Sequence, residues 1–461
     1  MNHCFGVYRA EDMSLFTDFY ELTMGAAYFD NQRFEPVTFD LFIRRFPENR
    51  SYFLFTGLEQ ILLYLQNIKF TEQHLDYLKG QGFNPQFLSY LRNFKFTGDV
   101  WAVPEGTVVF PNEPLIRVTA PIIEAQLVET FLLNTVNLQT TMSTKASRVV
   151  YAAKGKAVIE FGLRREHGVD AGMKVARSSY IAGCLGSSNV LAGMVYGIPV
   201  FGTMAHSFIM SYASELEAFR AFAKTFPMNS TLLIDTYDDL AGLKKAIIVA
   251  KELELQGFQL GGVRLDSGEL VETSKKIRAL LDANALGYVK IFASGDMDEF
   301  RISELLSNGA KIDSFGVGTK MGTSSDQPYL DVVYKLCETM TSSGDYLPIM
   351  KLSPDKLTLP GRKQIYRYKD SEGNYVQDVI ALDSEKKDAD PLLVNVMCNG
   401  KTTYSLPSLN QIRAYASENL SKLPEKHKSL TKAETYPVKL SQKLQTLTKA
   451  LHKKITKNEI T

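Results

Sequence analysis

The stretch TLLIDTYDDLAGLKKAIIVAKELELQGFQLGGVRL, residues 231–265, carries the pattern that decides the fold. It begins with a short apolar run that predicts a buried strand at Thr231–Ile234, and a second such run follows at Gly261–Leu265. Between them, apolar residues recur three and four positions apart over Asp239–Leu255, which indicates an amphipathic helix. A strand, a helix and a second strand in this order are typical of α/β proteins with parallel strands.

The same βα unit recurs on both sides of this stretch, from Ala157 to about Leu336. The apolar cores of the expected strands are nearly continuous, as in strands that are buried on both faces of a sheet. We therefore predict that residues 151–340 form an irregular, TIM-like α/β barrel that carries the catalytic site. The further strands are expected at Ala157–Phe161, Ile198–Gly202, Tyr288–Ala293, Ser314–Val317 and Asp331–Lys335, and the further helices at Ser207–Thr225 and Glu269–Asn284.

The residues on either side of this region follow another pattern. Residues 1–150 combine helix-like segments at Thr17–Phe29 and Gly57–Gln66 with strands over Trp101–Thr119 that prolines and glycines interrupt. Residues 341–461 alternate strands and turns and end in a lysine-rich amphipathic helix, which we expect to lie on the protein's own surface. We predict that the two segments pack together as a second, sandwich-like α+β domain. Its later strands are expected at Leu357–Tyr368 and Val376–Leu382.

The composition limits the classes of partner. The chain has 461 residues, of which 45% are hydrophobic and 22% charged, and its formal net charge of +1 argues against a nucleic-acid or membrane surface. The four cysteines lie far apart and lack the C-x-x-C spacing of a zinc site or redox pair. No apolar run reaches the roughly 18 residues of a membrane span. We therefore expect a cytoplasmic protein.

Glycines and polar residues follow almost every expected strand. Because barrel enzymes bind their substrates at the carboxyl ends of the strands, these residues form the candidate site. They are Gly162, Arg164 and Arg165; Thr203 and His206; Asp235, Thr236 and Asp238; Arg264, Asp266 and Ser267; Ser294, Gly295 and Asp296; and Gly316, Gly318 and Thr319.

The chemistry of this set favours a phosphorylated ligand. Glycines let backbone amides approach a phosphate, and arginine offers planar donors that match phosphate oxygens. The carboxylates of Asp235, Asp266 and Asp296 would repel phosphate unless Mg²⁺ or ribose hydroxyl groups lay between. The set therefore predicts a site for a magnesium-bound sugar phosphate or pyrophosphate.

Each position also has a structural alternative. The glycines can serve the turns alone, Asp235 and Asp266 can cap the helices that follow them, and the two arginines can form ion pairs at the rim. A lone histidine is more often structural than catalytic, but His206 is expected at the start of a helix. An imidazole at a helix N-terminus can accept a phosphoryl group, because the helix end favours developing negative charge.

Seven motifs occur in order along almost the whole chain. They are TDFYELTM at Thr17–Met24, EFGLRR at Glu160–Arg165, GSSNVLAG at Gly186–Gly193, GTMAHSF at Gly202–Phe208, RLDSGEL at Arg264–Leu270, SGDMDE at Ser294–Glu299, and FGVGTKM at Phe315–Met321. In this combination the chain resembles the nicotinate phosphoribosyltransferase family.

The resemblance implies a reaction on a salvage route to NAD. Nicotinate and phosphoribosyl pyrophosphate would give nicotinate mononucleotide and pyrophosphate, with ATP as co-substrate and Mg²⁺ as the metal. It implies that ATP phosphorylates His206, whose imidazole Asp235 would hold in the useful tautomer. It also implies a catalytic Asp266, which with Asp296 would hold Mg²⁺ at or near the pyrophosphate. The substrate-binding residues that we expect are Tyr20, Phe161, Arg164, Ser188, Thr203, Arg264, Ser267, Gly295, Asp296, Gly316, Gly318 and Thr319.

For the pyridine base, the resemblance implies an aromatic sandwich between Phe161 and the Tyr20 of a second subunit, and hence a homodimer. The related nicotinamide enzyme carries an aspartate at the position of Ser188, so the serine favours the acid over the amide. Glu166 and His167, which follow the two arginines, are a local variation on the family pattern; we assign no role to Glu166 and expect His167 at the solvent-exposed rim. Because Cys337 and Cys398 lack the spacing of the zinc site found in some short relatives, we expect no metal besides Mg²⁺.

Three alternatives remain open at the level of sequence. A nicotinamide or quinolinate phosphoribosyltransferase would share the fold and the chemistry. Another phosphate-binding barrel enzyme, such as an aldolase, would need a lysine at the barrel's mouth, which neither Lys290 nor Lys335 convincingly provides. A non-catalytic binding protein would tolerate alanine at both His206 and Asp266.

Overall fold

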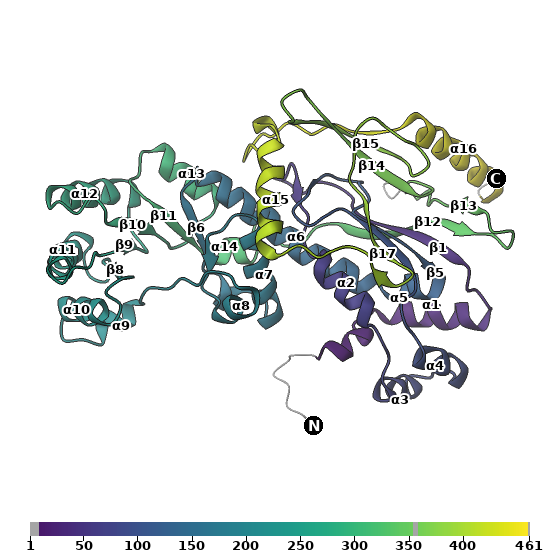
Figure 1. Ribbon diagram of the computed structural model, residues 1–461, viewed down its shortest axis with the longest axis horizontal. Coiled ribbons are helices and arrows are strands. Elements are labelled where there is room, and N and C mark those ends of the chain that lie inside the picture. The colour runs from purple at the N-terminus through teal and green to yellow at the C-terminus, as the bar shows by residue number, and fades with distance from the viewer. Residues whose placement is uncertain (1–8, 354–357, 460–461) are drawn as a thin grey trace. The chain divides into compact units, whose positions relative to one another are not determined.

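The computed structural model describes residues 9–353 and 358–459, which form two compact units (Figure 1). Unit 1 contains Met1–Thr141 and Tyr329–Thr461, and unit 2 contains Met142–Pro328. The chain passes from the first unit to the second within helix α6, Glu129–Ala152. Both observed boundaries lie somewhat earlier in the chain than residues 150 and 340, where the sequence placed them.

Unit 2 contains a six-stranded parallel sheet with the strand order β7-β6-β11-β10-β9-β8. The strands are short and mostly buried, because helices flank a parallel sheet and leave its strands little contact with water. Their bounds are β6 Ala157–Glu160, β7 Gly186–Ser187, β8 Thr231–Leu233, β9 Gly262–Leu265, β10 Lys290–Ala293 and β11 Ser314–Val317.

Helices alternate with these strands along the chain. The expected helix Ser207–Thr225 is in fact two helices, because the chain leaves the helical path after Met210 and Ser214 caps the second helix through the amide of Glu217. The elements are the 3₁₀ turn η2 Leu163–Arg165, α7 Val169–Ile181, α8 Val190–Tyr196, α9 His206–Met210, α10 Glu215–Thr225, α11 Asp239–Leu255, α12 Leu270–Ala283, α13 Glu299–Ser307 and α14 Thr319–Gly322.

The sheet of unit 2 is open, so the expectation of a TIM-like barrel is corrected. Within the described ranges the sheet ends at β7 and β8, and the expected strand Ile198–Gly202 contributes a single bridge between Ser187 and Val200. Pro199 lacks an amide hydrogen, so this segment cannot form a regular ladder. The expected barrel strand Asp331–Lys335 is also wrong, because it lies at the start of β12, which pairs with β1 in unit 1.

Unit 1 contains a seven-stranded antiparallel sheet in the order β13-β12-β1-β5-β3-β17-β18. The three strands that precede unit 2 lie together in the middle of this sheet, and β12 and β17, which follow unit 2 in the chain, flank them. Their bounds are β1 Pro36–Ile43, β3 Asp99–Ala102, β5 Ile116–Pro121, β12 Val332–Met340, β13 Tyr346–Pro348, β17 Val394–Cys398 and β18 Lys401–Thr402.

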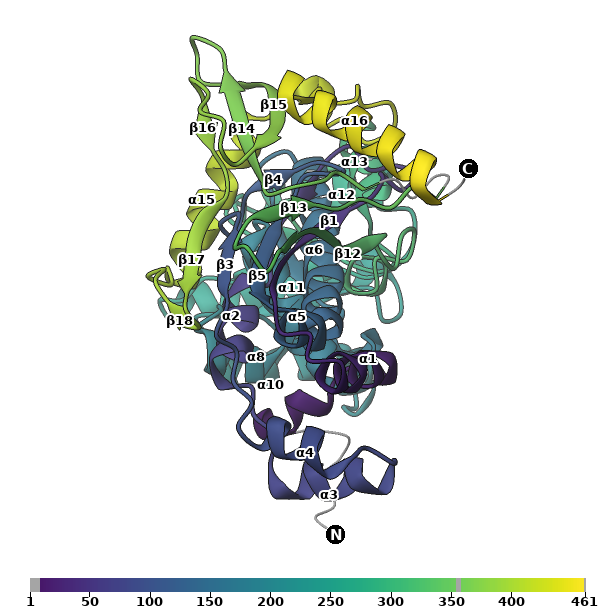
Figure 2. The same cartoon turned by 90° about the vertical axis from the view of Figure 1, so that its right-hand side faces the viewer.

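A four-stranded sheet, β16-β14-β15-β19, and a two-stranded pair, β2-β4, complete the strands of unit 1. Figure 2 shows α16 running alongside the four-stranded sheet. The strands are β2 Phe53–Leu54, β4 Val108–Val109, β14 Lys363–Lys369, β15 Tyr375–Leu382, β16 Asp390–Pro391 and β19 Val438–Leu440. The helices are η1 Ala10–Leu15, α1 Phe19–Asp30, α2 Leu58–Asn67, α3 Glu72–Gly80, α4 Pro85–Arg92, α5 Ile122–Leu127, α15 Leu409–Lys422, η3 Glu425–His427 and α16 Gln442–Glu459.

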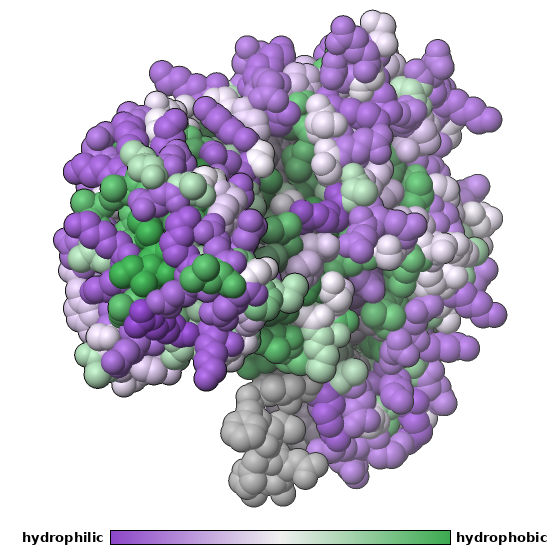
Figure 3. Space-filling model, turned by 60° about the vertical axis from the view of Figure 1, so that its left-hand side comes forward, coloured by the Kyte–Doolittle hydropathy of each residue, from purple (hydrophilic) through white to green (hydrophobic). Residues whose placement is uncertain are grey.

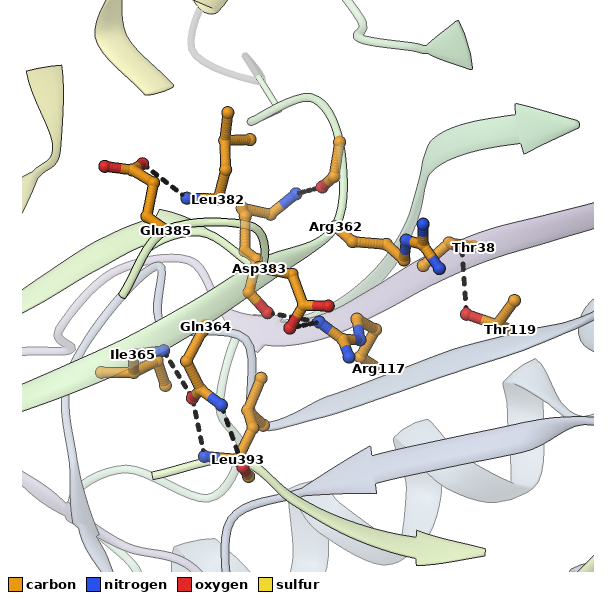
Figure 4. Close-up of polar contacts among 12 residues, drawn as sticks. Thr38, Arg117, Thr119, Arg362, Gln364, Ile365, Leu382, Asp383, Glu385 and Leu393 are labelled. Atoms are coloured by element: carbon orange, nitrogen blue, oxygen red, sulfur yellow. Dashed lines mark hydrogen bonds and ion pairs between the residues drawn. The ribbon is translucent and has the colours of Figure 1, made fainter. Parts of the chain in front are cut away.

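Buried polar contacts join the two chain segments of unit 1 (Figure 4). Arg117 on β5 donates to the backbone oxygen of Lys363 at 2.8 Å and to Asp383 Oδ1 at 2.9 Å. Within the C-terminal segment, Gln364 donates from Nε2 to the backbone oxygen of Leu393 at 3.0 Å. The expected strand Leu357–Tyr368 begins at Leu357, which lies outside the described residues, and its observed counterpart β14 starts at Lys363. In the described part of the chain, no helix combines the length and the apolar character needed to cross a membrane.

Candidate active site

Two adjoining cavities in unit 2 collect most of the candidate residues. The larger cavity has a volume of about 550 Å³ and the smaller one about 170 Å³, and both are lined by Phe161, Arg164, Arg264 and Asp266. The larger cavity is also lined by Leu163, Ser188, residues 201–207 and Leu233. The smaller cavity is also lined by Arg165, Ser294, Gly295, Asp296, Met297, Gly316, Gly318, Thr319 and Lys320.

Arg264 is the hub between the two cavities. Its Nε donates to Ser294 Oγ at 2.8 Å, its Nη1 to Thr203 Oγ1 at 3.1 Å, and its Nη2 to Asp266 Oδ1 at 2.7 Å. The guanidinium also lies 5.9 Å from the centre of the Phe161 ring. Because these contacts use all three nitrogens, Arg264 holds the walls of the site together before any ligand arrives.

Asp266 is kept as a carboxylate at this junction. Burial raises its pKa, but the hydrogen bond from Ser294 and the charge of Arg264 outweigh it, so the pKa lies below the ordinary value. Ser294 Oγ donates to Asp266 Oδ1 at 2.5 Å, the same oxygen that Arg264 contacts. Asp266 Oδ2 makes no hydrogen bond within the described residues, so one oxygen of an ionised carboxylate remains for a ligand or cation.

Arg164 and Arg165 behave differently from Arg264. Both belong to the turn η2 that follows β6, and both are exposed. Neither guanidinium forms a hydrogen bond or ion pair with the described residues, and Arg164 lines both cavities. The alternative interpretation, in which these two arginines form ion pairs at the rim, is therefore wrong. Both guanidinium groups lie at the cavities without a partner among the described residues.

His206 begins α9 and lines the larger cavity. Its Nδ1 lies 3.2 Å from Thr236 Oγ1, and its Nε2 makes no hydrogen bond with the described residues. We expected Asp235 to orient this imidazole, but the structure places its neighbour Thr236 in that position instead. The pairing leaves Nε2 as the nitrogen that can react.

Asp235 instead supports the loop after β9. Its Oδ2 accepts hydrogen bonds from the backbone amide of Asp266 at 2.7 Å and from Ser267 Oγ at 2.9 Å. Neither Asp235 nor Ser267 lines the described cavities, although the sequence placed both in the site. Their role in the geometry is to set the position of Asp266.

The loop after β10 forms a tight wall of the smaller cavity. Gly295 has φ +84°, and a Cβ there would lie 1.9 Å from the backbone oxygen of Asp266. Asp296 also has a positive φ, +50°, and its side chain is 83% exposed. It forms an ion pair at 3.0 Å with Lys320, a cavity residue that we had not singled out although it follows Thr319 directly.

Two aromatic rings pack together where the sheet meets the cavities. The rings of Phe161 and Phe292 meet edge to face at a centroid distance of 5.6 Å. A Cβ at Gly316 would lie 2.7 Å from Phe292 Cζ and 2.8 Å from Phe161 Cδ2, so only glycine leaves room for both rings. Phe161 is thereby fixed with part of its surface exposed to both cavities.

His167 is exposed, as expected, whereas Glu166, to which the sequence assigned no role, is half-buried. Both carboxyl oxygens of Glu166 are buried and receive no hydrogen bond from the described residues. Burial, and then the charge of Glu160, raise the pKa of Glu166 to about 9. The glutamate therefore carries a proton at neutral pH.

Tyr20 lies in unit 1, near the start of α1, and is 47% exposed. Its neighbour Phe19 is 55% exposed, so two aromatic rings are presented together at this helix end. Burial of the Tyr20 hydroxyl and the nearby charge of Glu129 raise its pKa, so the tyrosine is neutral.

Metal-ligating side chains are sparse in the described ranges, where no group of three or more histidines, cysteines, aspartates or glutamates could hold a metal ion. Asp266 and Asp296 are the two carboxylates of the smaller cavity. Mg²⁺ commonly binds through one or two carboxylates together with substrate phosphates, so this donor set fits a magnesium ion that a phosphorylated substrate carries.

Comparison with known proteins gives a consistent result along the chain. Residues 157–395 match the model of the nicotinate phosphoribosyltransferase family, and residues 15–137 and 385–448 match the models of that enzyme's N-terminal and C-terminal domains. The chain is 47% identical to the nicotinate phosphoribosyltransferase pncB2 of Mycobacterium tuberculosis over 434 residues, which cover 94% of this chain and 92% of the relative. It is 40% identical to the nicotinate phosphoribosyltransferase of Bacillus subtilis, with 94% of each chain covered.

Solved structures give the same picture. The crystal structure of human nicotinic acid phosphoribosyltransferase superposes with a TM-score of 0.84 at 30% identity, and the match covers 94% of this chain and 99% of the human one. The crystal structure of a nicotinate-nucleotide pyrophosphorylase from Pyrococcus furiosus superposes with a TM-score of 0.74 at 26% identity, covering 92% of this chain and 99% of the other.

Proposed function

The chain belongs to the nicotinate phosphoribosyltransferase family, and from this premise we propose that unit 2 transfers ribose 5-phosphate from phosphoribosyl pyrophosphate to nicotinate. The products are nicotinate mononucleotide and pyrophosphate, on a route to NAD. One observation carries the assignment of the site: two unpaired arginines and one ionised aspartate line two adjoining cavities whose joint size suits a small phosphorylated ligand.

The smaller cavity suits the phosphate groups. Arg164 and Arg165 supply planar donors that no described side chain occupies, and Lys320 adds a third cation. The glycines of the loops after β10 and β11, Gly295 and Gly318, let the backbone approach phosphate oxygens closely. When Mg²⁺ is bound, Asp266 and Asp296 would hold it, and it would neutralise charge on the leaving pyrophosphate.

The ribose carbon C1 loses pyrophosphate through an oxocarbenium-like state while the pyridine nitrogen forms the new C–N bond. Phe161 presents a fixed ring at the junction of the cavities, where a pyridine base can stack next to C1. The carboxylate of Asp266 faces the same junction and stabilises the positive charge that develops on the ribose. Ser188 in the larger cavity accommodates the carboxylate of nicotinate without adding a negative charge.

Coupling to ATP runs through His206. With Nδ1 bonded to Thr236 Oγ1, Nε2 keeps its lone pair for the γ-phosphorus of ATP; the P–N bond forms as the bond to the β-phosphate oxygen breaks and ADP leaves. Thr203, which bonds Arg264, lies in the same stretch of the larger cavity as His206. The phosphorylated imidazole would therefore add charge close to the hub that organises both cavities.

A second subunit completes the site in this proposal. Tyr20 would stack on the opposite face of the base from Phe161, which its exposure permits. Hydrophobic residues gather into patches on the face that Figure 3 shows, and contiguous apolar patches commonly mark protein–protein interfaces. We place the homodimer in the cytoplasm, which the widely spaced cysteines support.

The test is nucleotide formation from labelled nicotinate, with and without ATP. We expect His206→Ala to abolish ATP hydrolysis and acid-labile protein phosphate while a slow, ATP-independent transfer remains, because both substrate cavities survive. His167→Ala is the matched control, since this exposed histidine lines neither cavity, and it should leave all three readouts unchanged. Protein phosphate that persists in His206→Ala would show that another residue accepts the phosphoryl group.

Competition between bases tests the substrate. Nicotinate, nicotinamide and quinolinate should be compared at equal concentration with phosphoribosyl pyrophosphate. A preference for nicotinamide or quinolinate would overturn the assignment of the base, and sugar-phosphate turnover without any base would overturn the reaction itself.

A further inference from the structure

Glu166 occupies a niche that is walled by three glycines from three parts of unit 2. A Cβ at Gly162 or at Gly322 would lie 2.6 Å from Glu166 Oε1, and a Cβ at Gly172 would lie 3.2 Å from Oε2. No side chain larger than hydrogen could stand at the first two positions while this carboxyl group is in place. The niche therefore fits the carboxyl group of Glu166 closely.

The carboxyl group of Glu160 faces the same point. Its Oε1 lies 3.0 Å from the Cβ position of Gly162, where Glu166 Oε1 lies 2.6 Å away, so the two side chains meet there. Both oxygens of Glu160 already accept hydrogen bonds, Oε1 from the amide of Gly162 and Oε2 from Ser187 Oγ at 2.5 Å. Neither oxygen of Glu166 has a donor among the described residues.

This difference decides which group carries the proton. Burial raises the pKa of Glu160 as well, but its two donors favour the anion. By contrast, an ionised Glu166 would bury two unsatisfied oxygens next to a like charge. A protonated Glu166 can instead donate to Glu160. The cations on the two helices that adjoin Glu166 form ion pairs elsewhere. Lys174 pairs with Asp170 on α7, and Lys320 on α14 pairs with Asp296 and Asp298.

Glu166 also ends the turn that carries the two unpaired arginines. It is the residue directly after η2, and its backbone oxygen accepts a hydrogen bond from Gly168 at 2.9 Å, while Arg165 donates to Gly162 at 2.7 Å. The turn is thus held at Gly162 on one side and at Glu166 on the other. Moving the glutamate out of its niche would release Arg164 and Arg165 from the cavities.

We propose that Glu166, seated against Glu160 in the glycine niche, is a positioning residue that holds the Arg164–Arg165 turn toward the phosphate groups of the substrate. This inference rests on the proposed function, because it assumes that these arginines bind phosphate. It assigns a role to a residue that the sequence left without one.

The first test is kinetic. Glu166→Ala should raise KM for phosphoribosyl pyrophosphate roughly tenfold, as expected when one or two charge-assisted contacts to phosphate are weakened, with little change in kcat. Glu166→Gln keeps the shape and can still donate to Glu160, so it should restore the wild-type KM. His167→Ala, at the next position, is the matched control and should leave KM unchanged.

The second test uses pH. Above about pH 9 the wild-type glutamate ionises and KM should rise, whereas KM of Glu166→Gln should stay flat over the same range. The proton also links to folding, because the folded pKa of about 9 lies above the ordinary 4.5. The contribution of Glu166 to stability is complete below about pH 4.5 and falls as the pH rises toward 9. The Tm of Glu166→Gln should therefore rise relative to the wild-type Tm as the pH increases across that window.

The variant Arg164→Ala distinguishes a failure of the proposed function from a failure of the positioning role of Glu166. If Arg164→Ala leaves KM for phosphoribosyl pyrophosphate unchanged, the phosphate assignment of the proposed function is wrong. If it raises KM while Glu166→Ala does not, or if Glu166→Gln behaves like Glu166→Ala in a folded protein, the positioning role of Glu166 is wrong and the proposed function stands. Circular dichroism spectra confirm that each variant is folded.

Discussion

Gly295 illustrates how strongly a single residue can be constrained at this site. Its φ of +84° and the 1.9 Å approach that a Cβ would make to the backbone of Asp266 leave no room for a side chain. We predict that Gly295→Ala lowers the free energy of unfolding by about 1–3 kcal/mol, because the loop must strain or move. The shift of that loop should also raise KM for phosphoribosyl pyrophosphate.

Denaturant unfolding and steady-state kinetics check this prediction. Gly80→Ala serves as the control, because a Cβ there meets nothing within 4 Å and the φ of Gly80 is not positive. Wild-type kinetics in Gly295→Ala would mean that this loop does not contact the substrate.

For single residues too, the sequence predicted which residues gather at the site, but it could not predict which side chains form hydrogen bonds with one another. The strand-exit pattern favoured Arg164 and Arg264 equally, yet the Arg164 guanidinium has no partner among the described residues, whereas that of Arg264 donates to three side chains. Likewise, nothing in IDTYDD tells which of two neighbouring side chains reaches His206. The sequence assigned no role to Glu166, because nothing in it shows that Gly162, Gly172 and the distant Gly322 together enclose its carboxyl group.

Elements were predictable where two local signals agreed. Helix α11 spans Asp239–Leu255, as expected, because its apolar periodicity coincides with an N-terminal cap at Asp238. The segment at Ile198–Gly202 is apolar but contains a proline, and only one bridge forms there. An apolar run also does not encode its partner, so Asp331–Lys335 looked like one more parallel strand although β12 pairs antiparallel with β1.

A buried ion cluster joins two helices of unit 2. Glu299 at the start of α13 contacts Lys145 at 2.6 Å and Arg148 at 3.1 Å, and all three side chains are at most 1% exposed. We predict that Glu299→Gln lowers the free energy of unfolding by about 3–5 kcal/mol, because two cations would stay buried with less compensation. Urea unfolding followed by circular dichroism measures the change.

Glu304→Gln on the same helix is the matched control. Its partner Arg301 and Glu304 itself are exposed, so the loss should be no more than about 1 kcal/mol. Equal losses in the two variants would contradict the importance of the buried cluster.

At the scale of the whole molecule, the proposed homodimer predicts complementation between two variants that are each inactive in the ATP-dependent assay. Tyr20→Ala removes the residue that each subunit would lend to its partner, and His206→Ala removes the one that it keeps. In a mixed dimer, one site carries both defects and the other carries none. Co-refolded or co-expressed variants should therefore regain about a quarter of the ATP-dependent wild-type activity, since half of randomly paired dimers are mixed and each has one intact site.

The control is each variant mixed with itself, which should stay inactive in the ATP-dependent assay. No gain of activity in a mixture that does exchange subunits would place Tyr20 outside the partner's site.

The seven-stranded sheet of unit 1 has a consequence for synthesis on the ribosome. Strands β1, β5 and β3 leave the exit tunnel first, but the neighbours that flank them, β12 and β17, lie beyond residue 328 in the chain. All of unit 2 is translated in the interval, while both edges of the early three-stranded sheet lack their partners. Such edges attract other chains, so the nascent protein is most prone to aggregate during that interval and escapes the hazard only when its last third has been made.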